Sequence, residues 1–224
     1  MANQAPRIVL ATKNAHKIAE LARILAAGAT ARIGVDLAGL ADFPGAPQPA
    51  ETGGTFAENA LIKARAVAEF TGLPAVADDS GLCVDALNGM PGVLSARWAG
   101  RHGDDAANLE LVLAQLSDVP PGRRGAQFYC AAALVVPAAS VRSPTGPATE
   151  RVVSGRVVGR LTTQPRGSNG FGYDPIFVPE GEQRTMAEMA PAEKDAISHR
   201  GRAFRALASL IADLSLTNAA WPAT

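Results

Sequence analysis

The stretch Ala75-Val76-Ala77-Asp78-Asp79-Ser80-Gly81-Leu82 joins an apolar run to two adjacent carboxylates, a hydroxyl and a glycine. Its first three residues are typical of the end of a buried strand, where unpaired charges are costly. Carboxylates at a strand-to-turn junction suit a hard cation such as magnesium, but an Asp-Ser-Gly turn capped by its own side chains is an equally good interpretation. Neighbouring residues of an extended chain point to opposite faces, so Asp78 and Asp79 are expected to have different roles.

A second strand-to-turn junction lies at the start of the chain. Residues 7–11 are predicted to form a buried first strand, and the polar turn Thr12–Lys17 leads into a helix with one apolar face. Free backbone N–H groups and the positive end of the helix dipole favour phosphate at such a turn, although no Walker glycine pattern is present. An ordinary turn with Asn14 as N-cap is the alternative. We expect Lys17 to have a solvated head group, so that Lys17→Ala weakens triphosphate binding with little effect on stability.

A helix is expected immediately before the central strand. Thr55 and Glu58 match a capping box, and Gly72-Leu73-Pro74 is a typical helix stop. Capping is one interpretation of Glu58, and a catalytic role is the alternative. Lys63 lies two turns into this helix, where a solvated surface lysine is the usual outcome. The helix nevertheless leads directly into the strand that carries Asp79, which makes Lys63 a candidate site residue.

The second half of the chain carries one further informative loop. A helix over 106–116 and strands over 126–136 and 150–158 precede it. In the loop, glycines flank Phe171, which allows backbone and an aromatic ring to approach a ligand, and Asp174 precedes an expected strand over 175–178. A tight turn capped by Asp174 is the alternative. His199 and Arg200 stand at the front of a final helix, where the dipole disfavours cations, so they are expected to face an anion or an acceptor.

Composition limits the class of protein. The 224 residues fit one domain of 1–224, and 21 basic against 21 acidic residues give no overall field that attracts nucleic acid. Cys83 and Cys130 lie in apolar runs, as buried thiols do. No apolar stretch approaches the ~20 residues of a membrane span, and no signal segment is recognised. We therefore expect a soluble, cytoplasmic protein that does not bind membranes or nucleic acid.

Five motifs occur in an order that identifies a family. Together they closely resemble the inosine/xanthosine triphosphate pyrophosphatases (XTP/dITP diphosphatases), and the likeness runs from about Ile8 to Leu214. Each motif alone is weak, whereas five in register are specific. The motifs are residues 11–17, residues 55–60 with Lys63, residues 77–82, residues 170–175 and residues 198–200.

The resemblance implies an α/β fold in which a long twisted mixed β-sheet is flanked by helices, with two lobes and a central substrate cleft, in a homodimer. It implies Mg²⁺-dependent hydrolysis of deaminated purine nucleoside triphosphates (ITP, dITP, XTP) to the monophosphate and pyrophosphate. A pyrophosphatase for other modified nucleotides and a non-catalytic nucleotide-binding module are the alternatives. The module would not need Asp79.

The resemblance also assigns roles to residues. Asp79 is the family's catalytic acceptor and metal ligand. The residues expected to contact substrate are Thr12, Lys13, Asn14, Ala15, His16, Lys17, Lys63, Ser80, Phe171, Gly172, Tyr173, Asp174, Lys194, His199 and Arg200. Two positions depart from many relatives: Lys13 replaces a glycine, and Ala50 replaces an acid that contacts the metal, so that only Glu51 is acidic there.

The proposed chemistry suits these residue types. Pyrophosphate release needs neutralised phosphate oxygens and an acceptor for the proton of a water nucleophile, for which magnesium and Asp79 are the candidates. A nearby metal lowers the pKa of Asp79 and weakens it as a base, so its role as base or ligand stays open. Arg200 carries only donors, which suit a 6-keto oxygen and oppose the adenine amino group.

Overall fold

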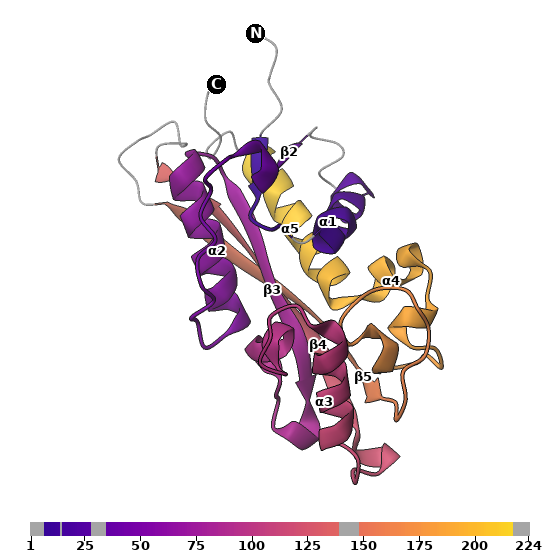
Figure 1. Cartoon of the computed structure of the whole chain (residues 1–224). Helices are drawn as coiled ribbons and strands as arrows, with labels where there is room; N and C mark the ends of the chain where they lie inside the picture. The colour runs from indigo at the N-terminus through magenta and orange to yellow at the C-terminus, as the bar shows by residue number, and fades with distance from the viewer. Residues whose placement is uncertain (1–6, 14, 28–34, 139–147, 217–224) are drawn as a thin grey trace. The chain divides into compact units, whose positions relative to one another are not determined.

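The computed structural model describes residues 7–13, 15–27, 35–138 and 148–216 (Figure 1). Its mixed six-stranded sheet has the order β2-β1-β3-β4-β5-β6. Strand β1 pairs in parallel with β2 and with β3, whereas β5 and β6 are antiparallel. With flanking helices, this confirms the predicted mixed α/β class. The strands are β1 (Arg7–Leu10), β2 (Asp36–Gly39), β3 (Ala75–Val84), β4 (Gly125–Val136), β5 (Thr149–Leu161) and β6 (Phe177–Pro179).

The chain divides into two compact units. The first unit contains residues 1–79, 131–154 and 203–224, and the second contains residues 80–130 and 155–202. Strands β3, β4 and β5 and helix α5 (His199–Leu216) each contribute residues to both. A single domain of 1–224 and a cleft between two lobes stay predictions.

Helices α1 (Ala15–Ala27) and α2 (Phe56–Thr71) belong to the first unit. Helix α2 begins with the predicted capping box: Thr55 Oγ1 accepts from Glu58 N–H at 3.2 Å, and Glu58 Oε2 accepts from Thr55 N–H at 3.2 Å. It ends at Gly72, whose φ of 69° is the left-handed conformation that glycine adopts without strain. Capping and the stop signal therefore place both ends of this helix where the sequence predicts them.

The second unit has its own apolar core, between β3, β4, β5 and helix α3 (Asp105–Gln115). The rings of Phe128 and Phe177 lie 4.7 Å apart at its centre. Each large apolar side chain buried in this way contributes ~1.5–3 kcal/mol to stability. The unit also contains helix α4 (Pro191–Ile197) and the loop of Phe171, with the predicted substrate residues Ser80, Phe171–Asp174, Lys194, His199 and Arg200.

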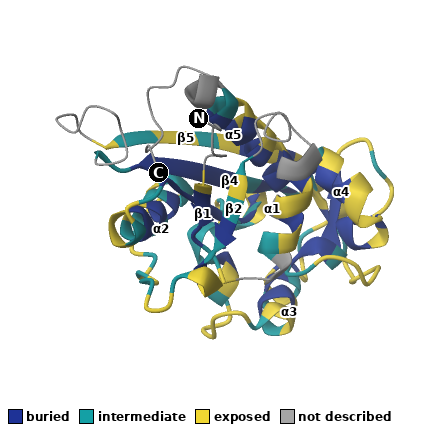
Figure 2. Cartoon of the chain, turned by 90° about the horizontal axis from the view of Figure 1, so that it is seen from above, coloured by how far each residue is buried: buried dark blue, intermediate teal, exposed yellow. Residues whose placement is uncertain are grey.

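The two long neighbouring strands β4 and β5 differ in burial (Figure 2). From Cys130 to Val136 every residue of β4 is buried, as expected for a central strand covered on both faces. Strand β5 alternates between buried and exposed positions over much of its length. The predicted strands 126–136 and 150–158 are thus confirmed, and β5 continues to Leu161 because Leu161 N–H donates to Arg124 O at 2.9 Å.

Two sequence predictions in these elements are wrong. Strand β3 does not end at the acidic pair but continues through Asp78 and Asp79 to Val84, because polar partners inside the fold compensate both carboxylates. The expected strand 175–178 is a 3₁₀ turn over 174–176 followed by β6. Cys83 and Cys130 are free thiols, as predicted, but only Cys130 is buried; the predicted burial of Cys83 is wrong, because this side chain is partly exposed. Among the described residues, no helix combines the length and the apolar character needed to cross a bilayer.

Candidate functional site

The two acids of β3 contact different helices of the first unit. Asp78 and Asp79 are 5% and 6% exposed. Asp78 Oδ2 lies 2.9 Å from Lys17 Nζ on α1. Asp79 Oδ2 accepts from Asn59 Nδ2 on α2 at 3.0 Å, and its Oδ1 lies 3.7 Å from Lys63 Nζ. The alternation of a strand therefore gives the neighbouring carboxylates different partners, as the sequence predicts.

Lys63 is a half-buried cation with two carboxylate neighbours. Its Nζ lies 2.6 Å from Glu51 Oε1, in addition to its approach to Asp79. The usual solvated surface lysine is therefore not what the structure contains. Counting Lys17 and Lys63 against Glu51, Asp78 and Asp79, this group carries one net negative charge. Negative charge on hard oxygen donors fits a divalent cation such as Mg²⁺.

The surroundings of Asp79 raise the pKa of its carboxyl group. Burial raises the pKa of Asp79, and Glu51 adds to this, while Lys63 and Asn59 oppose it. Burial alone lowers the pKa of Lys63, but the carboxylates of Asp78, Asp79 and Glu51 outweigh it and leave that pKa raised. Lys63 therefore stays a cation, and Asp79 is a stronger proton acceptor than a solvated aspartate.

The predicted phosphate-binding turn lies at the start of α1. Thr12 is half-buried and Lys13 is exposed, and the backbone before them is held by Ala11 N–H, which donates to Val76 O at 2.8 Å. Asn14 lies outside the described residues, as do the side chains of Ala15 and His16. The prediction that the head group of Lys17 is solvated is wrong, because this ammonium group forms an ion pair with the buried Asp78.

In the second unit, the structure brings together a further group of predicted residues. The Phe171 ring has Lys194 Nζ 5.2 Å and Arg200 Cζ 5.4 Å from its centroid. Arg200 Nη2 donates to Ser80 Oγ at 2.7 Å. Two cations therefore lie close to the Phe171 ring, and Ser80 accepts a hydrogen bond from one of them, Arg200.

Asp174 organises the loop of Phe171. It is 3% exposed, and its Oδ2 accepts from Phe171 N–H at 2.8 Å and from Lys194 Nζ at 2.6 Å. The capped turn considered as an alternative therefore exists. Gly170 has a φ of 76°, and a Cβ there would collide with the Asp174 carboxylate, so the turn requires glycine. Burial raises the pKa of Asp174, while Lys194, Phe171 N–H and Arg200 oppose the shift.

The remaining predicted residues of this unit have structural contacts. The ring of His199 stacks on Phe128, with centroids 4.7 Å apart and an angle of 10° between the planes. The Tyr173 hydroxyl donates to Ser95 O at 2.8 Å, and Gly172 N–H donates to Asp105 Oδ2 at 2.9 Å. Contacts of His199, Tyr173 and Gly172 with substrate stay predictions.

Sequence reasoning missed the residues that hold these groups. Asn59, Ser95 and Asp105 each bond to a predicted site residue or to its loop. Asn59 has a detectable signal: it is the polar member of the buried face of α2, which otherwise contains Ala60, Ala64, Val67 and Ala68. A polar residue in an apolar helical row needs a buried partner. Ser95 and Asp105 lie in irregular segments or at a helix start, where no such row exists.

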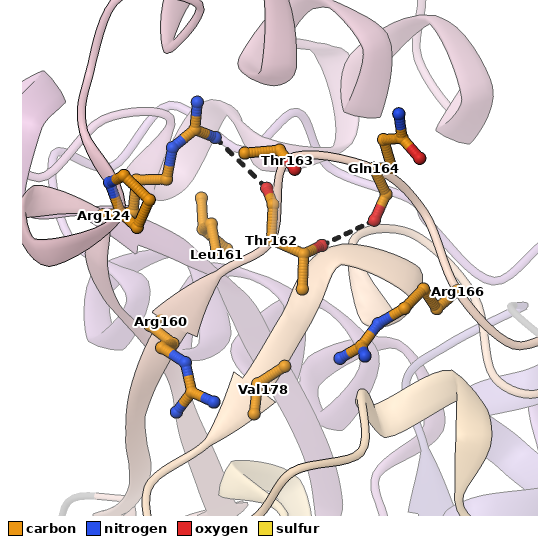
Figure 3. A pocket seen from close by; sticks show the side chains of 9 residues that line it. Arg124, Arg160, Leu161, Thr162, Thr163, Gln164, Arg166 and Val178 are labelled. Atoms are coloured by element: carbon orange, nitrogen blue, oxygen red, sulfur yellow. Dashed lines mark hydrogen bonds between the residues drawn. The ribbon is translucent and has the colours of Figure 1, made fainter.

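A pocket of about 360 Å³ in the second unit lies outside this set of residues (Figure 3). None of the predicted site residues lines it. The guanidinium of the buried Arg124 donates to three carbonyls there, those of Leu116, Val119 and Thr162, at 2.7–3.2 Å. Arg124 therefore stabilises the chain around the pocket. Its lining is Pro121, Arg124, Arg160, Leu161, Thr162, Thr163, Gln164, Arg166 and Val178.

The Ham1 family matches residues 8–210 of the chain. A dITP/XTP pyrophosphatase of Streptomyces coelicolor is 59% identical over 208 residues, covering 93% of this chain and 98% of the relative. A dITP/XTP pyrophosphatase of Frankia alni is 58% identical over 213 residues, with the same coverage of 93% and 98%.

Solved structures show the same likeness. The crystal structure of the nucleoside-triphosphatase, dITP/XTP pyrophosphatase, from Mycobacterium abscessus is 56% identical, with a TM-score of 0.69, and covers 92% of this chain and 98% of that chain. The structure of a HAM1 protein from Coxiella burnetii is 41% identical, with a TM-score of 0.77, and covers 93% of this chain and 99% of that chain.

Proposed function

The chain belongs to the Ham1 family, and we propose that it hydrolyses deaminated purine nucleoside triphosphates (dITP, XTP and ITP) to the monophosphate and pyrophosphate. One relative named a dITP/XTP pyrophosphatase is 59% identical to it over nearly the whole length of that relative. The observation that carries the proposal is the buried Asp79, which lies against Asn59 and Lys63 in a group that also contains Glu51.

We propose Mg²⁺ as the cofactor, held by the carboxylates of Asp79 and Glu51. Hard carboxylate oxygens and a net negative charge support this choice of ion. When bound, Mg²⁺ would supply charge neutralisation at the substrate phosphates. Glu51 would be the second protein ligand in place of the acid that Ala50 lacks.

The chain's own residues would carry the remaining steps. Lys13, Lys17 and Lys63 would neutralise phosphate oxygens, and the Thr12 hydroxyl would donate a hydrogen bond to one of them. Asp79 would accept the proton of the attacking water at Oδ1, on the side of Lys63. Breakage of the bond between the α- and β-phosphates would then release pyrophosphate.

The group around Phe171 would bind the base. Its ring can stack on any purine, which adds affinity without choosing among bases. Arg200, held by Ser80, has donors only and would bond a 6-keto oxygen. The adenine amino group would leave those donors unpaired, at a cost of ~1–3 kcal/mol each. Asp174 and Lys194 would keep Phe171 in position.

A nucleotide panel tests this function. The protein is incubated with Mg²⁺ and each of dITP, XTP, ITP, ATP and GTP, and the products are separated into monophosphate, diphosphate, phosphate and pyrophosphate. We expect rapid release of pyrophosphate from the deaminated nucleotides and slow release from ATP and GTP. Binding of nucleotide without turnover would show a non-catalytic module instead. Release of phosphate with a diphosphate would exclude attack at the α-phosphate.

We further propose a homodimer in the cytoplasm, which follows from the family resemblance and from the composition. Light scattering coupled to gel filtration measures the mass of the assembly. One chain has a mass of 23.0 kDa, so a measured mass near this value would contradict the dimer.

A further inference from the structure

Asn59 joins two segments of the first unit through one carboxamide. The residue is 0% exposed, within the buried face of α2. Its Oδ1 accepts from Gly53 N–H at 2.8 Å, and its Nδ2 donates to Asp79 Oδ2 at 3.0 Å. A backbone donor on one side and a carboxylate acceptor on the other allow only one orientation of the amide.

The loop held by the Oδ1 end carries Glu51. Its backbone packs tightly on the start of α2, because a Cβ at Gly53 would lie 2.6 Å from Glu58 Cβ and 2.8 Å from Asn59 Oδ1. Gly54 N–H donates to Glu58 Oε2 at 2.7 Å and continues the attachment. Two residues before Gly53, Glu51 reaches Lys63. The position of this carboxylate therefore depends on the segment that Asn59 holds.

We propose that Asn59 is a positioning residue that sets the geometry of both carboxylates, Asp79 and Glu51, for a divalent cation. It contacts neither substrate nor cation and acts through the two acids. This inference rests on the proposed function for its effect on turnover. Partners of metal-binding carboxylates that do not touch the metal commonly affect affinity or activity by ~10–100-fold.

The test uses Asn59→Leu, which keeps the approximate volume and removes both hydrogen bonds. Binding of Mn²⁺ to the free protein is measured by the relaxation of water protons, together with the Mg²⁺ dependence of dITP hydrolysis and the melting temperature. We expect weaker Mn²⁺ binding, a higher Mg²⁺ requirement and a lower kcat, each by about 10–100-fold. Gly53→Ala disturbs the same amide from the loop side. It is expected to change Mn²⁺ binding, the Mg²⁺ requirement and kcat in the same directions, so it tests the inference if Asn59→Leu does not fold.

Asn108→Leu is the matched control. Asn108 is also a buried helical asparagine, with Oδ1 accepting from Ala99 N–H at 2.7 Å, and no bond to a carboxylate is present among its described contacts. We expect this variant to melt at a lower temperature with unchanged Mn²⁺ binding and Mg²⁺ requirement. If Asn59→Leu behaves in the same way, Asn59 has only a structural role and the inference is wrong.

A double-variant cycle tests whether Asn59 acts through Asp79. In an Asp79→Asn background, Asn59→Leu is expected to reduce kcat by less than about threefold, because interacting residues are not additive. Losses in kcat that multiply would show that Asn59 does not act through Asp79, and would overturn that part of the inference. If the wild-type protein hydrolyses no nucleotide, the proposed function fails, whereas the Mn²⁺ measurements on Asn59→Leu and Asn108→Leu still decide the role of Asn59.

Discussion

Replacement of Lys194 by methionine removes the cation that compensates a carboxylate inside the second unit. Asp174 is 3% exposed, and Lys194 Nζ lies 2.6 Å from its Oδ2. Methionine keeps most of the aliphatic volume but no charge, so the variant must either bury an uncompensated aspartate or protonate it. Breaking a buried pair from one side costs ~3–5 kcal/mol of unfolding free energy.

Protonation of Asp174 limits the loss of unfolding free energy in Lys194→Met and makes this loss depend on pH. Neutralising an aspartate with an unfolded-state pKa of about 3.9 costs about 1.4 kcal/mol per pH unit above that value. The limit is therefore ~5.6 kcal/mol at pH 8 and ~1.5 kcal/mol at pH 5. The full loss of ~3–5 kcal/mol is expected only at the higher pH.

The direction of the pH effect follows from proton binding. Burial already raises the pKa of Asp174 in the folded protein, and loss of Lys194 raises it further. Between the unfolded and the folded pKa, the folded state binds more protons, so the unfolding free energy falls as pH rises through the folded pKa. For a chain of this length, 1 kcal/mol corresponds to about 2–4 °C, so Lys194→Met is expected to melt ~6–20 °C below the wild type at pH 8. At pH 5 the difference is expected to be small.

The assay is thermal unfolding of both proteins by circular dichroism at pH 5 and pH 8. Arg184→Met is the control, because Arg184 pairs with Glu193 at the surface and its loss should give no pH-dependent difference. Asp174→Asn combined with Lys194→Met removes the buried charge and is expected to recover most of the loss at pH 8. An equal loss at both pH values would refute the charge argument and leave lost packing as the cause.

Three further variants test the proposed site. Asp79→Asn is expected to lower kcat on dITP by about 100-fold or more with little change in melting temperature, and near-normal turnover would remove the catalytic assignment. Lys17→Ala is expected to raise KM and, because Asp78 loses the ammonium group 2.9 Å away while Lys63 still acts on it, to lower stability by ~1–3 kcal/mol; an unchanged melting temperature would refute a stabilising role of the Lys17–Asp78 pair. Arg200→Ala is expected to narrow the ratio of ITP to ATP activity by about tenfold, and parallel losses would show that Arg200 does not distinguish the bases.

Local signals predicted the local structure well. Thr55, Glu58 and Gly72 mark the ends of α2 because capping depends on backbone groups within one turn of the helix. The long apolar run of β4 likewise indicates a strand buried on both faces. Such signals need no knowledge of distant parts of the chain.

The failures concern partners that are far apart in sequence. Asp78 was expected to end a strand because its cation, Lys17, lies 61 residues earlier and no local pattern connects the two. Once that pair exists, the strand can continue with both charges buried. A separation of 20 residues likewise hides the hydrogen bond between Asn59 and Asp79, although a polar residue in an apolar row of α2 indicates that some partner is needed.

The ammonium group of Lys63 balances part of the negative charge of Glu51 and Asp79 without a metal ion. With Lys63 in place, neither acid needs a metal in order to be charged inside the fold. We therefore expect the chain to fold in the presence of a chelator, and we expect the proposed divalent ion to be needed for turnover alone. The stability of the fold would then not depend on a bound metal. Small metal-dependent domains differ in this respect, because they unfold when a chelator removes their ion.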